Sequence, residues 1–84
     1  MAGILVSVGK EVSAEVVNVL NQYGPVGMVS PELFSIKTEE PIATICTKIA
    51  TAFPAVSHIL IAEVSDIAFQ GAGQISFAAK ILRK

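Results

Sequence analysis

The sequence has few charged side chains and a single cysteine. Charged residues make up 15% of the chain, whereas soluble proteins average about 25%. The only cysteine, Cys46, excludes an internal disulfide bond and any metal site built on paired cysteines, and we expect it in the core. With a net charge of −1, the chain also lacks an overall basic field that would concentrate nucleic acid near it.

Long hydrophobic runs are also missing. No apolar stretch approaches the roughly 18 residues that a membrane-spanning helix requires. The N-terminus has neither the basic segment nor the cleavage site of a secretory signal peptide. We therefore expect a reduced, cytoplasmic setting and no membrane partner.

Apolar side chains are abundant, at 52% of 84 residues. A chain of this length forms one domain with a modest core, because the buried fraction of a protein rises with its size. We therefore expect part of the apolar surface to lie against another chain, most simply a second copy. The alternative is a compact monomer of low charge.

The order of predicted elements is strand, helix, strand, strand, helix, strand. The first strand is a β-branched apolar run that ends at Gly9. The first helix ends before Gly24 and Pro25, and a hairpin follows it. The last strand is apolar on both sides, which is typical of an interior strand. The predicted strands are residues 2–8, 26–30, 33–38 and 57–64, and the predicted helices are residues 14–23 and 41–53.

This order predicts an α+β fold, the ferredoxin-like βαββαβ sandwich. Right-handed crossovers give a four-stranded antiparallel sheet with two helices on one face. We expect a single domain over residues 1–84, with a core at 1–64, a loop at 65–74 and a C-terminal extension at 75–84. The second face of the sheet is left open and apolar, which favours a partner.

The C-terminal extension fits two periodicities. Ile75 and Phe77 alternate with polar or small residues after two glycines, which favours a fifth strand. Ile75, Ala78, Ala79 and Leu82 also fit a helix, so this alternative stays open. A fifth strand pairs with the sheet edge of a neighbouring chain. The residues that we expect at a homodimer interface are Phe69, Ile75 and Phe77.

Several short stretches carry a resemblance to a known family. They run through most of residues 3–73 and end with a small-aromatic-x-Gly motif at Ala68 to Gly71. These stretches are residues 4–7, 19–24, 30–38, 40–42, 58–64 and 67–71. In them the chain resembles the small CRISPR-associated ferredoxin-like proteins of spacer acquisition, and more closely their stand-alone SinR-like relatives.

The resemblance implies a homodimer joined through sheet faces and C-terminal strands. In CRISPR-associated members it also implies nucleic-acid contact or metal-dependent nuclease activity. The family's nuclease aspartate ends the first strand, where this chain has Val8 or Gly9. Paired carboxylates would be needed to hold Mg²⁺, so we expect no catalytic residues, no bound metal and no cofactor.

The remaining polar candidates are weak. Glu11 and the lone His58 lack converging partners in the sequence, and surface positions are typical of such residues. A glycine pair at Gly71 and Gly73 is not a P-loop, because the lysine and the Ser/Thr of that motif are absent. The basic residues form either a small phosphate-binding strip or a solvated surface. These basic residues are Lys10, Lys80, Arg83 and Lys84.

Three hypotheses for function follow from these observations. The first is a non-catalytic, homodimeric binding or scaffold protein of the SinR-like kind, associated with nucleic acid or with another protein. The second is a small phage or mobile-element protein that binds and inhibits a host defence complex. The third is a weak metal-dependent nuclease that uses Glu11, His58 or Asp66.

Overall fold

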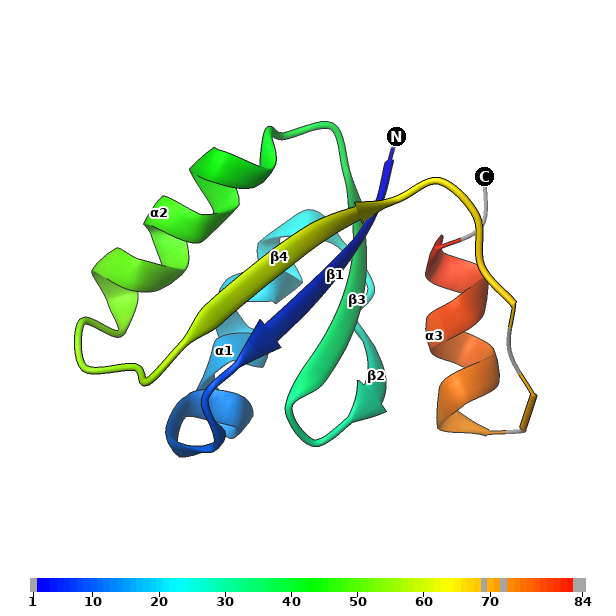
Figure 1. Cartoon of the computed structure of the whole chain (residues 1–84), viewed down its shortest axis with the longest axis horizontal. Helices are drawn as coiled ribbons and strands as arrows, with labels where there is room; N and C mark the ends of the chain where they lie inside the picture. The colour runs from blue at the N-terminus through cyan, green and yellow to red at the C-terminus, as the bar shows by residue number, and fades with distance from the viewer. Residues whose placement is uncertain (1, 69, 72, 83–84) are drawn as a thin grey trace.

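A computed structural model of the chain describes residues 2–68, 70–71 and 73–82. Within these residues, a four-stranded antiparallel sheet has the order β2–β3–β1–β4 (Figure 1). The four strands lie within the ranges predicted from the sequence, which confirms the predicted strands. The strands are β1 (Ala2–Val8), β2 (Gly27–Ser30), β3 (Leu33–Thr38) and β4 (Ile59–Val64).

Two helices cover one face of this sheet, as the sequence predicts. They are α1 (Ser13–Leu20) and α2 (Ile42–Ala52), and 3₁₀ turns flank α1 at Lys10–Val12 and Asn21–Tyr23. Gly24 then ends the first helical segment with a φ of 111°, a conformation that favours glycine. Alternate residues of β1 and β3 point toward the helices and form the core with them. The core residues are Ile4, Val6, Val8, Val12, Val16, Leu20, Phe34, Ile36, Ile45 and Ile49.

The C-terminal extension is helical over its described residues, which run to residue 82, so the predicted fifth strand is wrong. α3 (Gln74–Leu82) buries Ala78, Ala79 and Leu82, which share one helical face. A helix satisfies most of its backbone hydrogen bonds internally, whereas a fifth strand would need a free sheet edge beside it. The helical spacing of apolar residues over the whole segment therefore determines its structure, and the short Ile-Ser-Phe alternation does not.

The third helix packs closely on the opposite face of the sheet, because the residues beneath it are small (Figure 1). A Cβ atom at Gly3 would lie 2.6 Å from the carbonyl oxygen of Leu82, and one at Gly27 would lie 2.5 Å from the Cα of Ala78. The buried hydroxyl of Ser35 donates a hydrogen bond of 3.0 Å to the carbonyl oxygen of Ala78. The two glycines thus allow α3 to approach the sheet, and the hydrogen bond from Ser35 holds it there.

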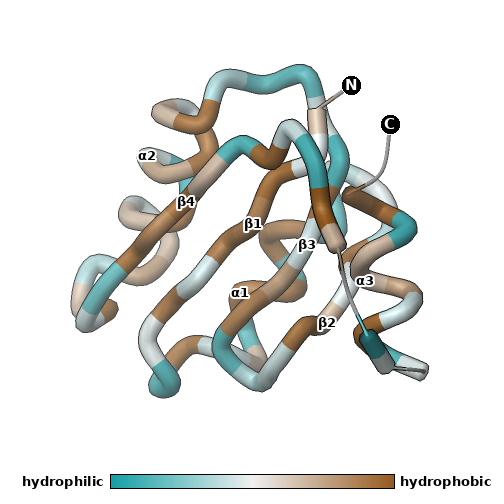
Figure 2. The backbone as a smooth tube through the Cα atoms, turned by 45° about the vertical axis from the view of Figure 1, so that its right-hand side comes forward, coloured by the Kyte–Doolittle hydropathy of each residue, from teal (hydrophilic) through white to brown (hydrophobic). Residues whose placement is uncertain are grey.

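Only part of this second face is covered. α3 lies mainly over β2 and β3, so the predicted open apolar face is wrong for that half of the sheet. The prediction is confirmed on the β4 side, where Leu60 is 67% exposed and Ala62 is also exposed. Figure 2 shows apolar residues recurring along both β1 and β4.

β4 itself is an edge strand, and its predicted interior position is wrong. In the sheet order it has β1 on one side and no described strand on the other. Its apolar pattern arises because Ile59 and Ile61 pack against the core while Leu60 faces the other side of the sheet. An edge strand that is apolar on both faces is the unusual feature of this fold.

The arrangement is compatible with a ferredoxin-like α+β fold extended by α3. The antiparallel order and the two crossovers through α1 and α2 agree with that architecture. Among the residues described, none of the helices has the length and apolar character needed to cross a bilayer.

The close packing of α3 on the sheet can be tested at Gly27. We expect Gly27→Ala to destabilise the protein by about 1–3 kcal/mol, because the added methyl group overpacks the helix–sheet contact. Ser30→Ala, on the exposed end of the same strand, should change stability by less than about 0.5 kcal/mol. Urea unfolding monitored by circular dichroism measures both. Equal effects of the two substitutions would contradict the close packing described above.

Candidate functional site

A polar cluster lies where β1 ends and β4 begins. The Ser7 hydroxyl and the Nε2 atom of His58 are 3.2 Å apart, although the two residues are separated by 51 positions. The β1–β4 pairing continues just beyond the strands, because the Gly9 N–H donates to the carbonyl oxygen of His58 at 3.2 Å. Strand pairing therefore brings these residues together.

Glu11, in the 3₁₀ turn after β1, joins the same cluster. Its carboxylate accepts the backbone N–H of Ser57, the residue before His58. This hydrogen bond is the largest cause that lowers the pKa of Glu11, and the backbone N–H of Glu11 and the nearby His58 lower it further. The turn approaches closely because residue 9 is glycine: a Cβ there would collide with the Glu11 carboxylate and the Ser57 hydroxyl.

The cluster unites two of the three residues of the nuclease hypothesis. Asp66 lies beyond the other end of β4, a strand roughly 20 Å long, and its carboxylate accepts the N–H of Ile67. At the position of the family's aspartate, the Val8 side chain is buried in the core. Within the described residues, no group of three His, Cys, Asp or Glu side chains gathers to hold a metal ion.

The two predicted basic contacts that the structure describes, Lys10 and Lys80, lie apart from each other. Lys10 follows the C-terminal end of β1, beside the polar cluster. Lys80 instead lines a shallow depression with Lys37, and Lys37 pairs with Gly3 near the opposite end of β1. The other two predicted phosphate contacts, Arg83 and Lys84, lie outside the described residues.

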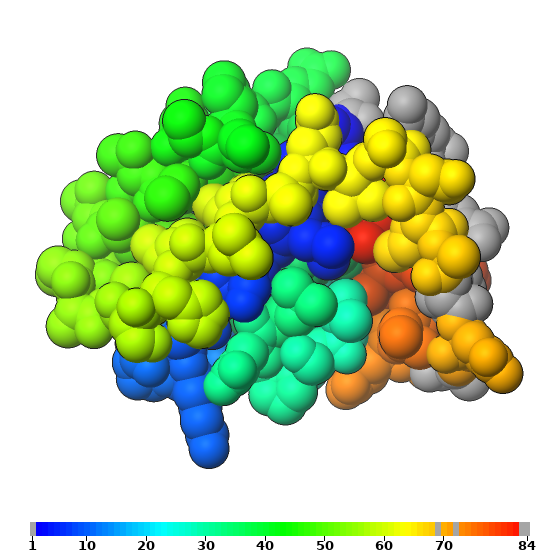
Figure 3. Space-filling model, in the orientation of Figure 1, coloured from blue at the N-terminus to red at the C-terminus, as the bar shows by residue number. Residues whose placement is uncertain are grey.

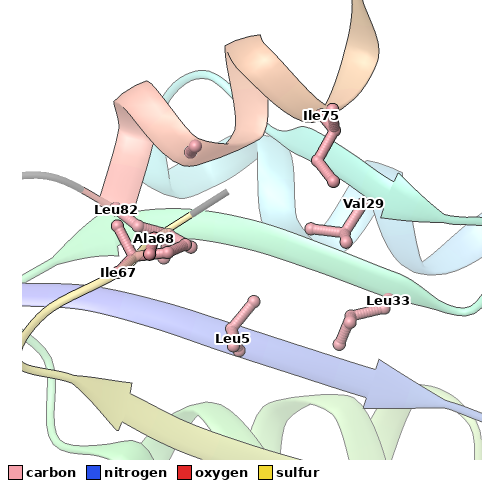
Figure 4. A pocket seen from close by; sticks show the side chains of 8 residues that line it. Leu5, Val29, Leu33, Ile67, Ala68, Ile75 and Leu82 are labelled. Atoms are coloured by element: carbon pink, nitrogen blue, oxygen red, sulfur yellow. The ribbon is translucent and has the colours of Figure 1, made fainter. Parts of the chain in front are cut away.

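The two predicted interface residues that the structure describes, Ile75 and Phe77, lie on different sides of α3. Phe77 is 50% exposed and lies beside Lys37 and Lys80. Ile75 is half-buried and lines an apolar groove of about 160 Å³ between α3, the sheet and Ile67 (Figure 4). Phe69 lies outside the described residues. Because Ile75 and Phe77 face different surroundings, they do not form a continuous patch.

A larger apolar surface lies along β4 and the neighbouring helix α2. Leu60 is 67% exposed and Ile42 of α2 is 41% exposed. Both line an open groove of about 350 Å³ between α2 and β4, together with the half-buried Cys46. Figure 3 shows β4 at the surface beside α2. Cys46 thus faces this groove at the margin of the core.

Ser7, Gly9 and Ser57 are the residues of the polar cluster that sequence reasoning missed. Their short polar or absent side chains carry no motif, and their proximity depends on strand register. Pairing the first predicted strand with the last in antiparallel register would have placed Ser7 near His58, which is the one signal that the sequence offered.

Comparison with known proteins adds no assignment. No protein-family model matches the chain, and a search of curated proteins finds no significant match.

The charge of Glu11 should make stability depend on pH. The pKa of Glu11 is lowered in the folded state, so its contribution is complete at neutral pH. This contribution is lost as the pH falls below the ordinary glutamate value of about 4.3 and through the lowered folded pKa. We expect Glu11→Gln to lower the melting temperature at pH 7 and to have a diminishing effect toward about pH 3. Melting temperatures of both proteins across this range test the prediction, and a constant difference would contradict it.

Proposed function

We propose that the protein is a non-catalytic binding or scaffold module that works as a homodimer, of the SinR-like kind that its sequence resembles. The observation that supports this proposal best is the exposed apolar edge strand β4. Natural proteins protect such edges with charges, proline, bulges or a covering element, because an open edge recruits another strand. Over Ile59–Val64, Glu63 is the only charged residue.

The surroundings of β4 extend this surface. Leu60 projects from one face of the strand, and Ile42 lies across the groove on α2. Low overall charge means that little electrostatic repulsion opposes the approach of two copies. Burying these side chains against a second copy contributes roughly 1.5 kcal/mol or more for each large residue that is fully covered. Symmetry doubles that contribution, because each residue occurs once in each copy.

The dimer itself is tested at Leu60. We expect the wild-type chain to sediment as a dimer at micromolar concentration and Leu60→Glu to weaken association by about 100-fold, because two buried leucines are lost. Phe77→Glu is the matched control, since Phe77 is also exposed but lies on α3, away from β4. Sedimentation velocity measures association, and circular dichroism verifies that both variants fold. A wild-type monomer, or equal effects of the two variants, would reject the proposal.

A second candidate function is metal-independent phosphodiester cleavage at the polar cluster. The contact between Ser7 and His58 favours it, because an exposed imidazole can transfer a proton while the nearby Lys10 attracts phosphate. In this function His58 removes the proton of the ribose 2′-hydroxyl, which attacks the adjacent phosphorus. The protonated imidazole then returns a proton to the departing 5′-oxygen as its P–O bond breaks.

Cleavage of single-stranded RNA without added metal tests the second candidate. We expect His58→Ala to reduce the rate by about 100-fold or more if His58 carries the proton transfer. Asp66→Ala is the control, because Asp66 lies at the far end of β4 and should leave the rate unchanged. Absence of cleavage, or equal cleavage by wild type and His58→Ala, would rule the candidate out.

A further inference from the structure

The hydrogen-bonding groups on the open edge of β4 follow from its pairing with β1. The Val8 N–H donates to Glu32 on the β3 side, whereas the Gly9 N–H donates to His58 on the β4 side. Because antiparallel pairs alternate, His58, Leu60, Ala62 and Val64 direct their backbone groups toward β1. The backbone N–H and C=O groups of Ile59, Ile61 and Glu63 therefore point away from the sheet.

The two edges of the sheet differ in their protection. β2 is short, has an irregular register between Met28 and Ser30, and is followed by Pro31. β4 is longer, keeps a continuous register with β1 and contains no proline or lysine. An open groove also separates β4 from α2, so the helix does not cover the outer edge of this strand. By these criteria β4 is the edge that accepts another strand.

We infer that β4 pairs antiparallel with β4 of a second copy, with Ile61 on the two-fold axis; this inference rests on the proposed homodimer. In this register Ile61 lies opposite Ile61 of the second copy, and Ile59 lies opposite its Glu63. Each of these pairs exchanges both of its backbone hydrogen bonds. All the outward-pointing groups of β4 are then satisfied.

The side chains agree with this register. Leu60 lies opposite Ala62 of the second copy on the face that α3 leaves open, so a large residue meets a small one. The pairing covers Leu60, the most exposed large apolar side chain among the described residues. The two Glu63 carboxylates lie at opposite ends of the paired strands, which avoids repulsion between them.

Neighbouring registers are less satisfactory. A shift in one direction places Glu63 opposite Ser57 of the second copy, but the N–H of Ser57 already donates to Glu11. A shift in the other direction places Ile59 opposite Ser65, which lies beyond the end of β4, and brings the two Glu63 side chains closer. The polar cluster at the start of β4 thus helps to set where the paired strands end.

Engineered disulfides test the register. In a Cys46→Ala background, one preparation carries Leu60→Cys and another carries Ala62→Cys; both positions are exposed, so the fold should be retained. Facing residues of this type of pair have Cα atoms about 4.5 Å apart, within the range of a disulfide bond. After mixing and mild oxidation, we expect covalent dimers in the mixture and little cross-linking in either preparation alone.

The outcomes separate this inference from the proposed function. Efficient cross-linking of Leu60→Cys alone or of Ala62→Cys alone would establish a shifted register and overturn the inference, although a β4 dimer would remain. No cross-linking in any sample, while sedimentation still shows a dimer, would exclude β4 pairing but keep the homodimer. A monomer by sedimentation would reject both proposals.

Discussion

Burial of β1 from both sides is the constraint on which the fold depends. This strand pairs with β3 along one edge and with β4 along the other. The residues of β1 that face α1 and α2, which are Ile4, Val6 and Val8, are almost fully buried. On the opposite face, Gly3 leaves room for α3. β1 thus presents a continuous row of branched residues to the pair of helices, whereas on the other face Gly3 admits the end of α3 and Leu5 lines the groove beside it.

The regular elements of the first 64 residues were predictable because their signals are local. Apolar periodicity, together with Gly24, Pro25 and Pro31 between the elements, is written in short stretches of sequence. The C-terminal helix was not predictable in this way, because the segment from Ile75 to Ala79 fits a strand and a helix equally well. Contacts with Gly27 and Ser35, which are distant in sequence, favour the helix, and no local pattern records them.

Less of the candidate site than of the fold was predictable from the sequence. Glu11 and His58 were recognised as isolated residues, but their meeting depends on the register between β1 and β4. The apolar character of β4 was recognised too, yet it was interpreted as interior burial. Periodicity reports which faces of a strand are apolar and contains no information about whether a neighbour lies beside it. Leu60 shows this most clearly, because an interior strand would bury it and the structure leaves it 67% exposed.

The irregular strand β2 has a consequence for how large an assembly can become. A sheet that grows by joining two copies through β4 ends on both outer sides at β2. There the register breaks between Met28 and Ser30 and Pro31 follows, so the ends offer a poor template for another chain. In the proposed dimer, growth through sheet edges would therefore end at two subunits, because the irregular β2 edge is a poor template for the addition of further strands.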